Sequence, residues 1–448
     1  MRFSLTSAFG DGVENTRSMP LLPNMRLKLP APALNESGER SPCAVVEFRS
    51  EQCSSSAAPL RKRPTELSGG IRAALVEGAM VCLVLTACHE GVTAPGPIQF
   101  ASVTAGNDQS CGVSSMSRGY CWGSPLGDGT SGSSTTPVAI PRLIFSTLTA
   151  GVYHSCGLAP GGKAYCWGQN ATGVLGNGTS TDSWTPVPVS GGLTFAMLTA
   201  GGGRTCGLTT DGAAYCWGEN DSGELGTGNS SGPQMCRGGS HCSTTPVAVS
   251  GGLTFVVLSA GVRHTCGITA THVAYCWGYN FDGELGAGTT TGPDSCGGIP
   301  CSLTPVAVTG GLAFTAVSAG YIHSCGLTTA GVAYCWGNSS PGPDSVRTGL
   351  TFSAVSAAVY HTCGLTVAGA AYCWGYNTYG QLGNGDTTTS WAPVPVSGGL
   401  VFSAVSTGGT HSCALTVSHA VYCWGLNSEG ELGNGTKTGS SVPVAVVY

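Results

Sequence analysis

Charged side chains are scarce in this sequence, and basic ones above all. The 448 residues include 18 Lys and Arg against 23 Asp and Glu, so that only 9% of them are charged. From Ile98 onward, eight basic residues stand against fourteen acidic ones, which gives a formal charge of −6. Phosphate binding requires clustered cations. Because this part of the chain offers only Lys163, Lys437 and six scattered arginines, we expect no nucleic acid partner.

Recognisable catalytic and metal motifs are also missing. The sequence contains no His-Glu-x-x-His zinc motif and no phosphate loop of the form Gly-x-x-x-x-Gly-Lys-Ser/Thr. Carboxylates do occur near one another, as at Asp221 and Glu224 or Asp282 and Glu284, but without the ligand spacing of a calcium loop. We interpret these segments as turns. We therefore expect a protein that is not an enzyme and that holds neither a cofactor nor a metal.

An unbroken apolar run long enough to span a membrane is absent as well. The most apolar stretch, Ile71–Cys88, is interrupted by Glu77. It resembles a bacterial lipoprotein signal, because Leu85–Cys88 matches the lipobox and Cys88 becomes the lipidation candidate. Such signals normally begin a chain, and a misassigned start codon would explain why this segment lies well inside the sequence. We accordingly expect a disordered or mis-started region at 1–70, a signal at 71–88, a tether at 89–97 and a folded domain at 98–448.

Cysteine and glycine, by contrast, are abundant and recur at fixed intervals. The chain has 22 Cys and 71 Gly. Seven cysteine pairs share a ten-residue separation: Cys111 with Cys121, Cys156 with Cys166, Cys206 with Cys216, Cys266 with Cys276, Cys325 with Cys335, Cys363 with Cys373 and Cys413 with Cys423. Each pair lies in the pattern His-x-Cys-Gly-Leu and then Tyr-Cys-Trp-Gly, which returns about every fifty residues and predicts a repeat protein of seven modules.

The constant separation predicts a disulfide across an antiparallel hairpin. Directly opposed residues such as Cys156 and Cys166 have Cα atoms close enough for a disulfide. Zinc is the alternative, but a zinc site needs four ligands, usually in close pairs, and each hairpin offers two distant thiols. Two closer pairs are also expected to bridge: Cys236 with Cys242 and Cys296 with Cys301. Paired usage on this scale predicts an oxidising compartment.

Each module carries four strand-like segments. A Pro-Val strand such as Thr185–Val189 is followed by an alternating strand such as Phe195–Ala200 and then by the two strands of the cysteine hairpin. The predicted fold class is all-β, a seven-bladed β-propeller with four short antiparallel strands per blade. Because the array opens without a Pro-Val strand and ends on one, we expect the C-terminal strand Val442–Val447 to join the first blade and close the ring.

The repeat itself resembles that of a known family. The phrase Ala-Gly-x-x-His-x-Cys-Gly-Leu, then Tyr-Cys-Trp-Gly-x-Asn-x-x-Gly-x-Leu-Gly, is similar to the regulator of chromosome condensation repeat. Its Asn-x-x-Gly-x-Leu-Gly tail is complete at Asn170–Gly176, Asn220–Gly226, Asn280–Gly286, Asn377–Gly383 and Asn427–Gly433. The resemblance implies a seven-bladed propeller, here a bacterial exported cysteine-rich variant. The chain is also similar in architecture to the propeller-type β-lactamase inhibitory protein, which implies binding through loops on one face.

One repeat position is occupied by histidine in five modules. These residues are His154, His264, His323, His361 and His411, while Gln109 and Arg204 stand at the same position in the first and third modules. We interpret each side chain as bonded to backbone where its strand begins. A metal-binding or catalytic ring at one end of the central channel is the alternative.

Two modules differ from the others by insertions. The third and fourth modules are lengthened at the same position, and each insertion contains one of the closer cysteine pairs. We expect both loops to emerge side by side on one face of the disc. Their candidate binding residues are Met235, Arg237, His241 and Ile299, and ordinary loop growth is the alternative. The fifth module has lost its tail, so the ring is expected to be shallow there.

These features together favour a non-catalytic, exported or lipid-anchored propeller. We expect it to be a monomer that binds a protein or surface polymer at the cell envelope or outside the cell. Membrane attachment would occur only through the lipid. The alternatives are a guanine-nucleotide-exchange-factor-like regulatory module, as in the founding family member, and a polysaccharide-active enzyme, which would require acidic residues converging on the central channel.

Overall fold

The computed structural model describes residues 43–45, 86–88 and 98–448, except for positions 238 and 347. Strands β1 (Cys43–Val45) and β2 (Thr86–Cys88) pair antiparallel as a two-stranded sheet. The remaining described residues belong to one unit, Pro97–Tyr448. Most of the expected leader, signal and tether segments lie outside the described residues, and lipidation of Cys88 stays a prediction. In the described ranges, no helix is long and apolar enough to cross a bilayer.

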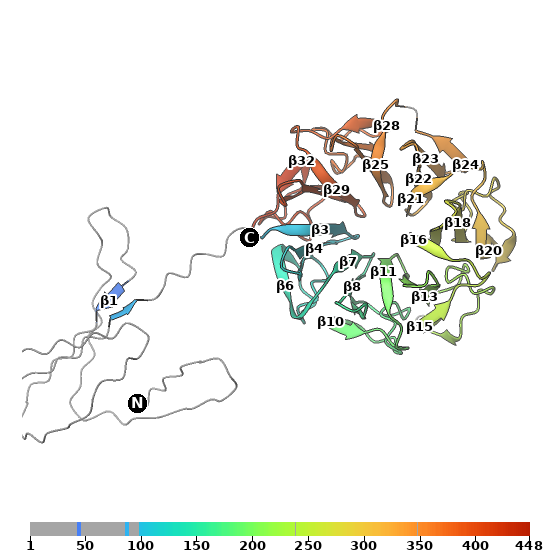
Figure 1. Cartoon of the computed structure of the whole chain (residues 1–448), viewed down its shortest axis with the longest axis horizontal. Helices are drawn as coiled ribbons and strands as arrows, with labels where there is room; N and C mark the ends of the chain where they lie inside the picture. Colours follow the sequence, from blue (N-terminus) through green and yellow to red (C-terminus); the bar gives the residue numbers. More distant parts are fainter. Residues whose placement is uncertain (1–42, 46–85, 89–97, 238, 347) are drawn as a thin grey trace, which may run out of the picture. The chain divides into compact units, whose positions relative to one another are not determined.

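Seven antiparallel sheets are arranged around a central axis, which confirms the all-β seven-bladed propeller (Figure 1). The innermost strands are β3 (Phe100–Ala105), β7 (Thr147–Ala150), β11 (Phe195–Ala200), β16 (Phe255–Ala260), β21 (Phe314–Ala319), β25 (Phe352–Ala357) and β29 (Phe402–Thr407). The second strands are β4 (Gln109–Ser114), β8 (His154–Leu158), β12 (Arg204–Thr209), β17 (His264–Thr269), β22 (His323–Thr328), β26 (His361–Thr366) and β30 (His411–Thr416).

The two outer positions of each blade complete the sheets. The third strands are β5 (Arg118–Gly123), β9 (Ala164–Gly168), β13 (Ala214–Glu219), β18 (Ala274–Tyr279), β23 (Ala333–Gly337), β27 (Ala371–Gly375) and β31 (Val421–Gly425). The fourth strands are β6 (Ser134–Ile144), β10 (Ser183–Pro188), β15 (His241–Ala248), β20 (Ile299–Ala307), β24 (Ser340–Ser345), β28 (Ser390–Pro395) and β32 (Ser440–Ala445). The third and fourth blades add a fifth edge strand: β14 (Gln234–Met235) and β19 (Asp294–Cys296).

The cysteine hairpin of each blade has the predicted register. In the second blade Cys156 lies opposite Cys166 and Gly157 lies opposite Tyr165. All seven long-separation pairs form disulfides, with Cα atoms 4.0–4.1 Å apart: Cys111 with Cys121, Cys156 with Cys166, Cys206 with Cys216, Cys266 with Cys276, Cys325 with Cys335, Cys363 with Cys373 and Cys413 with Cys423. The closer pairs are bridged as well: Cys236 with Cys242 and Cys296 with Cys301. Because both sulfurs of every predicted pair are used in a disulfide, these cysteines offer no thiolate to zinc.

The hydrophobic core is divided among the interfaces between neighbouring blades. Between the second and third blades, the disulfide of Cys156 and the side chain of Leu175 pack against Phe195 and Trp217 of the next blade. These four residues are at most 2% exposed. Equivalent clusters recur around the ring, so each blade is stabilised by apolar area buried against its two neighbours.

The expected closure of the ring by the C-terminal strand is wrong. Strand β32 pairs with β31 of its own blade, with Cys423 opposite Val444, and the first blade has its own fourth strand, β6. The Pro-Val segment therefore ends a blade rather than beginning one, because it pairs back onto the Tyr-Cys-Trp strand that precedes it. The ring closes instead through packing between the first and seventh blades, where Phe100 and Trp122 contact Leu432.

Candidate binding surface

The five histidines at the shared repeat position connect neighbouring blades. Each Nε2 lies within hydrogen-bond distance of a hydroxyl on the next blade rather than a backbone group, so the expected partner is corrected. The pairs are His154–Thr205 at 2.8 Å, His264–Ser324 at 2.6 Å, His323–Thr362 at 2.8 Å, His361–Ser412 at 2.8 Å and His411–Ser110 at 2.8 Å. The hydroxyl residue directly follows the histidine position of the next blade, which places it across the interface.

Gln109 and Arg204 contact the same hydroxyl, since Arg204 Nε donates to Thr265 Oγ1 at 2.8 Å and Gln109 Nε2 donates to Ser155 Oγ at 3.4 Å. Their longer side chains also reach the backbone of the next blade. Gln109 Nε2 donates to the carbonyl of Gly151 at 3.2 Å, and Arg204 Nη1 donates to that of Val262 at 3.2 Å. These two side chains therefore add backbone hydrogen bonds to the hydroxyl contact that the histidines make.

Burial keeps this ring of histidines neutral. Desolvation lowers the pKa of His154, His264 and His361 to about 3 and that of His323 and His411 to about 4. Each imidazole is therefore neutral, and its Nε2 forms one hydrogen bond with a hydroxyl of the next blade. In the described part of the chain, no group of three or more potential metal ligands is present.

Most repeat disulfides belong to the core, whereas Cys335 of the fifth blade is partly buried and lines a cavity. Cys121, Cys216 and Cys373, which supply the second sulfur in the first, third and sixth blades, are each 0% exposed. All three lie in the hydrophobic clusters between blades. Among the predicted site residues, these cysteines therefore stabilise the fold, and a partner cannot reach them.

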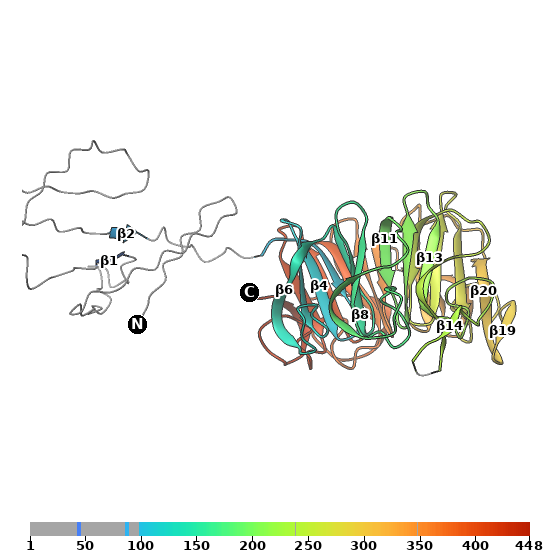
Figure 2. The same ribbon diagram turned by 90° about the horizontal axis from the view of Figure 1, so that it is seen from below.

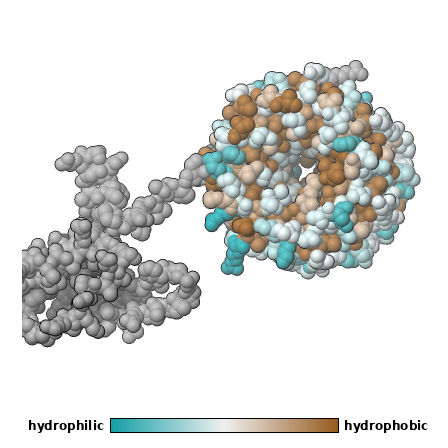
Figure 3. Space-filling model, viewed as in Figure 1, coloured by the Kyte–Doolittle hydropathy of each residue, from teal (hydrophilic) through white to brown (hydrophobic). Residues whose placement is uncertain are grey.

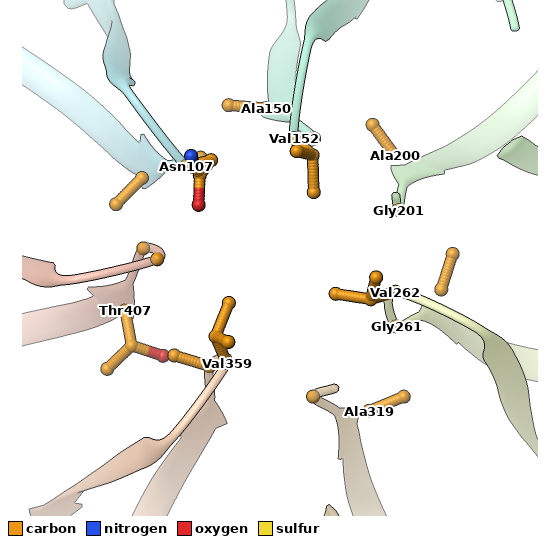
Figure 4. A pocket seen from close by; sticks show the side chains of 18 of the residues that line it. Asn107, Ala150, Val152, Ala200, Gly201, Gly261, Val262, Ala319, Val359 and Thr407 are labelled. Atoms are coloured by element: carbon orange, nitrogen blue, oxygen red, sulfur yellow. The ribbon is translucent and has the colours of Figure 1, made fainter. Parts of the chain in front are cut away.

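The central channel is narrow and lined by small side chains. Its opening of about 90 Å³ is bordered by alanine, glycine and valine from every blade together with one Asn and one Thr. Figure 4 shows Asn107, Val152, Val262 and Val359 directed toward the opening. Hydrophobic side chains also gather around the channel mouth on the face seen in Figure 3. The residues that border this opening carry no ionisable group, so it lacks the converging acids that the polysaccharide-enzyme alternative requires.

The two insertions form disulfide-bridged hairpins at the outer edges of neighbouring blades. β14 pairs with β15 and β19 pairs with β20, and Figure 2 shows both hairpins toward the same side of the disc. Met235 is 59% exposed and Ile299 is 37% exposed. Arg237 forms an ion pair with Asp182 at 3.2 Å. Among the candidate residues, these two apolar side chains are thus free to meet a partner.

His241 is less available than the sequence indicated. Its Nδ1 lies 2.9 Å from the Asp221 carboxylate, and its backbone N–H donates to the same oxygen at 2.9 Å. Both contacts hold the start of β15 against the tail of the third blade. We therefore regard His241 as a residue that orders the hairpin.

A band of aromatic side chains crosses the fourth, fifth and sixth blades, and sequence reasoning missed it. Its members, in order, are Phe281, Tyr279, Arg263, Tyr321, Tyr360, Tyr376 and Trp391. Adjacent ring centroids lie 5.3–6.3 Å apart, and the Arg263 guanidinium bridges two tyrosine rings at 5.3 and 5.9 Å. Such aromatic and cation–π contacts are typical of interface anchors.

The aromatic band adjoins the hairpin of the fourth blade. Tyr279 lies opposite Cys301 in the register of β18 and β20, close to Ile299 at the start of β20. Phe281 is 60% exposed and Trp391 is 61% exposed. The available sequence signal was the position after Trp-Gly, which is Tyr in the fourth and sixth modules only. Its significance depends on contacts between modules, which no single repeat reveals.

Comparison with known proteins identifies the repeat. Two models described as "Regulator of chromosome condensation (RCC1) repeat" match the chain. One matches residues 161–208, 272–327, 368–415 and 418–448. The other matches residues 145–173, 198–224, 255–284, 314–342, 352–381 and 402–431.

Solved structures with the same fold are similar at low sequence identity. The structure of yeast RCC1 (Prp20) bound to Kap60 has a TM-score of 0.62 and 19% identity, covering 73% of this chain and 83% of that one. Human WBSCR16 has a TM-score of 0.61 and 18% identity, covering 70% of this chain and 85% of that one. At these identities the likeness establishes the shared architecture.

Proposed function

The chain belongs to the regulator of chromosome condensation repeat family, and from that membership we propose that it is an exported, non-catalytic propeller that binds a protein or surface polymer at the cell envelope. Its nine disulfides indicate an oxidising, extracytoplasmic location. An exchange factor for an intracellular GTPase would work in a reducing compartment, which weighs against that alternative. A lipid at Cys88 would provide the envelope attachment.

The observation that carries this proposal is the composite surface on the third to sixth blades. It comprises the aromatic band, the fourth-blade hairpin that adjoins this band, and the third-blade hairpin. Met235 and Ile299 of the two hairpins are exposed. Aromatic, Met and Arg side chains are the residue types that interfaces favour. A disulfide-bridged hairpin is already ordered before it meets a partner, so binding costs it little conformational entropy.

A capture experiment with envelope extract tests this surface. We expect replacement of residues 229–242, and of residues 289–301, by the four-residue linker of the second blade, residues 179–182, to abolish partner capture while leaving the propeller folded, because the second and sixth blades form their fourth strands with linkers of this length. Trp391→Ala should also weaken capture at least tenfold, as an aromatic hot spot does. Tyr153→Ala is the control, since Tyr153 is 51% exposed in the second blade, outside the band. Capture that survives both changes would contradict the proposal.

Intact-mass analysis of the mature protein addresses export separately. Processing immediately before Cys88, the added mass of a lipid and the loss of eighteen hydrogens in nine disulfides would be measured together. A mature protein that retains free thiols at the repeat pairs would overturn the exported location.

A further inference from the structure

One carbonyl in each complete tail receives two hydrogen bonds from the next blade. Val174 O accepts from Thr205 Oγ1 at 2.9 Å and from Trp217 Nε1 at 2.7 Å. The same pair of donors, a Ser or Thr hydroxyl and a Trp indole, reaches four more tail carbonyls: Glu224 O, Glu284 O, Gln381 O and Glu431 O. The tail thus attaches one blade to the next.

The residue after each of these carbonyls is a leucine whose side chain is buried between the two blades. Leu175, Leu225, Leu285, Leu382 and Leu432 are all 0% exposed. The glycine that follows leaves room for the tryptophan ring, since a Cβ at Gly383 would lie 2.7 Å from Trp424 Nε1. Its φ of +70° also favours glycine. A short x-Leu-Gly turn is therefore the unit that each tryptophan accommodates.

The fifth blade does not supply this unit. After Gly337 the chain turns through Asn338 and Ser339, both with positive φ, directly into β24. The first blade has a shortened tail too, but that tail still contains a buried leucine, Leu126, 3% exposed, followed by Gly127 beside Trp167. The turn is present there without the tryptophan hydrogen bond, since Trp167 Nε1 is buried with no partner among the described residues. Only between the fifth and sixth blades, among the described residues, is the turn missing altogether.

Both donors remain in place at this gap. Thr362 and Trp374 line a cavity of about 460 Å³ between the two blades. His323 Nε2 lies 2.8 Å from Thr362 Oγ1, so the hydroxyl is oriented as it is in the filled interfaces. No acceptor lies within hydrogen-bond distance of the Trp374 indole N–H in the part of the chain that the structure describes, and Trp374 is the most exposed tryptophan of its repeat position, at 8%.

The mouth of the cavity is formed by the end of the aromatic band. Tyr360, Tyr376 and Trp391 border it, with edge-to-face ring contacts at 5.5 and 5.3 Å. These rings are 42%, 44% and 61% exposed. The lining also includes polar side chains, among them Asn338, Ser340 and Asp344. A cavity with two convergent donors, a mixed lining and an aromatic rim has the composition of a ligand site.

We propose that the gap between the fifth and sixth blades binds an x-Leu-Gly turn presented by a partner protein. The carbonyl before the leucine accepts hydrogen bonds from Thr362 and Trp374, and the leucine fills the cavity beside the Trp374 ring. The site lies apart from the bridged hairpins but shares its aromatic rim with the surface of the proposed function. It therefore rests on that function and deepens it, because it specifies the chemistry of one bound segment. A peptide is favoured over a glycan because the occupant of the six other interfaces is a peptide turn of this chain's own sequence.

Titration with a synthetic peptide tests this site. The probe is the sixth tail, residues 377–385 (Asn-Thr-Tyr-Gly-Gln-Leu-Gly-Asn-Gly), and binding is followed by isothermal calorimetry. We expect saturable binding with a dissociation constant below about 1 mM. The same peptide with Ala in place of Leu should bind at least about tenfold more weakly, since a buried leucine is lost. Thr362→Val and Trp374→Phe should each weaken binding about fivefold, as expected for one lost hydrogen bond.

Two variants serve as matched controls. Replacing residues 338–339 with the sixth tail and its flanks, 376–389, should fill the gap, abolish peptide binding and raise the melting temperature. Trp424→Phe removes the same N–H where the chain's own tail is already bound, so peptide binding should stay as in the wild type. Deletion of the hairpins should also leave it unchanged, which separates this site from the proposed function.

The outcomes that would overturn the proposal are distinct. Undetectable binding to the folded wild type at millimolar peptide would refute it, as would equal binding to the gap-filled variant. Competition of the peptide by a neutral oligosaccharide, or oligosaccharide binding alone, would assign the gap to a glycan. Circular dichroism of each variant confirms folding, and Thr362→Val suffices if Trp374→Phe does not fold.

Discussion

At the scale of single residues, the ring of buried histidines links stability to pH. Each one titrates near 6.5 in the unfolded chain and at about 3 to 4 in the fold. Unfolding therefore takes up protons once the pH falls below about 6.5. The histidines do not lower the free energy of unfolding above that pH, and they lower it progressively as the pH falls toward 4. Glu224 and Glu284 act in the opposite sense, since burial raises their pKa to about 7 and about 8.

We accordingly predict maximal stability near neutral pH and a steep loss in acid. His154→Gln should reduce the slope of unfolding free energy against pH by about 1.4 kcal/mol per pH unit between pH 4 and 6, the effect of one proton. Gln109 already occupies this repeat position in the first blade, so the substitution is compatible with the interface. Chemical denaturation at several pH values measures the slope. An unchanged slope would mean that His154 is not neutral in the fold.

Glu284 is a second residue whose charge the fold suppresses. Its Oε2 accepts a hydrogen bond from the Asp282 backbone at 3.0 Å, and its Oε1 is buried without a partner. Gln381 occupies the same position in the sixth tail and accepts the same bond, from Tyr379 N, at 2.9 Å. A neutral side chain is therefore what this position accommodates.

We predict that Glu284→Gln raises the free energy of unfolding at pH 8 by about 1–3 kcal/mol, and that the gain disappears by about pH 5. The folded carboxyl keeps its proton up to about pH 8, whereas the unfolded one loses it near 4.5, so stability is lost as the pH rises between these values. Glu429→Gln, at a half-exposed tail position whose carboxylate lies 3.7 Å from Lys437 Nζ, should change stability by less than about 0.5 kcal/mol, as surface ion pairs do. An equal effect of both substitutions would contradict the assignment to burial.

At the scale of the element, the disulfides divide into two classes. The hairpin disulfides of the repeats lie within the inter-blade core, and Cys266 and Cys276 are both 0% exposed. The insertion disulfides join the added hairpin segments to the fourth strands β15 and β20, and they lie in none of the hydrophobic clusters that the described residues form between blades. The first class is expected to stabilise the fold, and the second to order a surface.

We predict that Cys266→Ala with Cys276→Ala lowers the free energy of unfolding by about 2 kcal/mol or more, through the lost crosslink and the cavity left behind. Cys236→Ala with Cys242→Ala in the preceding blade should cost markedly less, because this disulfide closes a shorter loop, with a sequence separation of 6 instead of 10, and lies outside the inter-blade clusters. Denaturant titration of both variants gives the comparison.

Complete reduction should lower the melting temperature by many degrees while sheet-rich circular dichroism persists. A melting temperature that reductant leaves unchanged would show that the pairs are not bonded.

At the scale of the whole molecule, the ring closes through side-chain packing and hydrogen bonds between the first and seventh blades. Phe100 is 0% exposed against the seventh blade, and Trp122 Nε1 donates to Glu431 O at 2.8 Å. These contacts repeat those of interior interfaces, where Phe255 and Trp277 meet the third blade. Closure is therefore one more inter-blade interface, with no strand shared between the ends of the propeller.

We predict that Phe100→Ala and Phe255→Ala destabilise the propeller equally, each by about 3–5 kcal/mol. Both variants remove one buried ring from equivalent clusters, and urea denaturation measures the cost. A much smaller effect of Phe100→Ala would show that the ring is open at the junction of the first and seventh blades. A shared closing strand would instead appear as lost amide protection of β32 in that variant.

The sequence by itself determined what lies within one module. The ten-residue cysteine spacing specified the disulfides and the register of Cys156 with Cys166, because a tight hairpin leaves few alternatives over so short a separation. The repeat of about fifty residues specified seven like sheets, and hence the propeller. The sequence did not determine to which blade each Pro-Val strand belongs, because the same segment could begin one blade or end the blade before it.

Only the tertiary structure decided what lies between modules. The hydroxyl partners of the histidines, the band that joins Tyr279 to Trp391 and the cavity beside Trp374 each combine residues from neighbouring blades. Such residues are about forty to sixty positions apart, so no local pattern records their contact. Their adjacency follows from the radial packing of blades, which brings every module's second and third strands against the tail of the module before it.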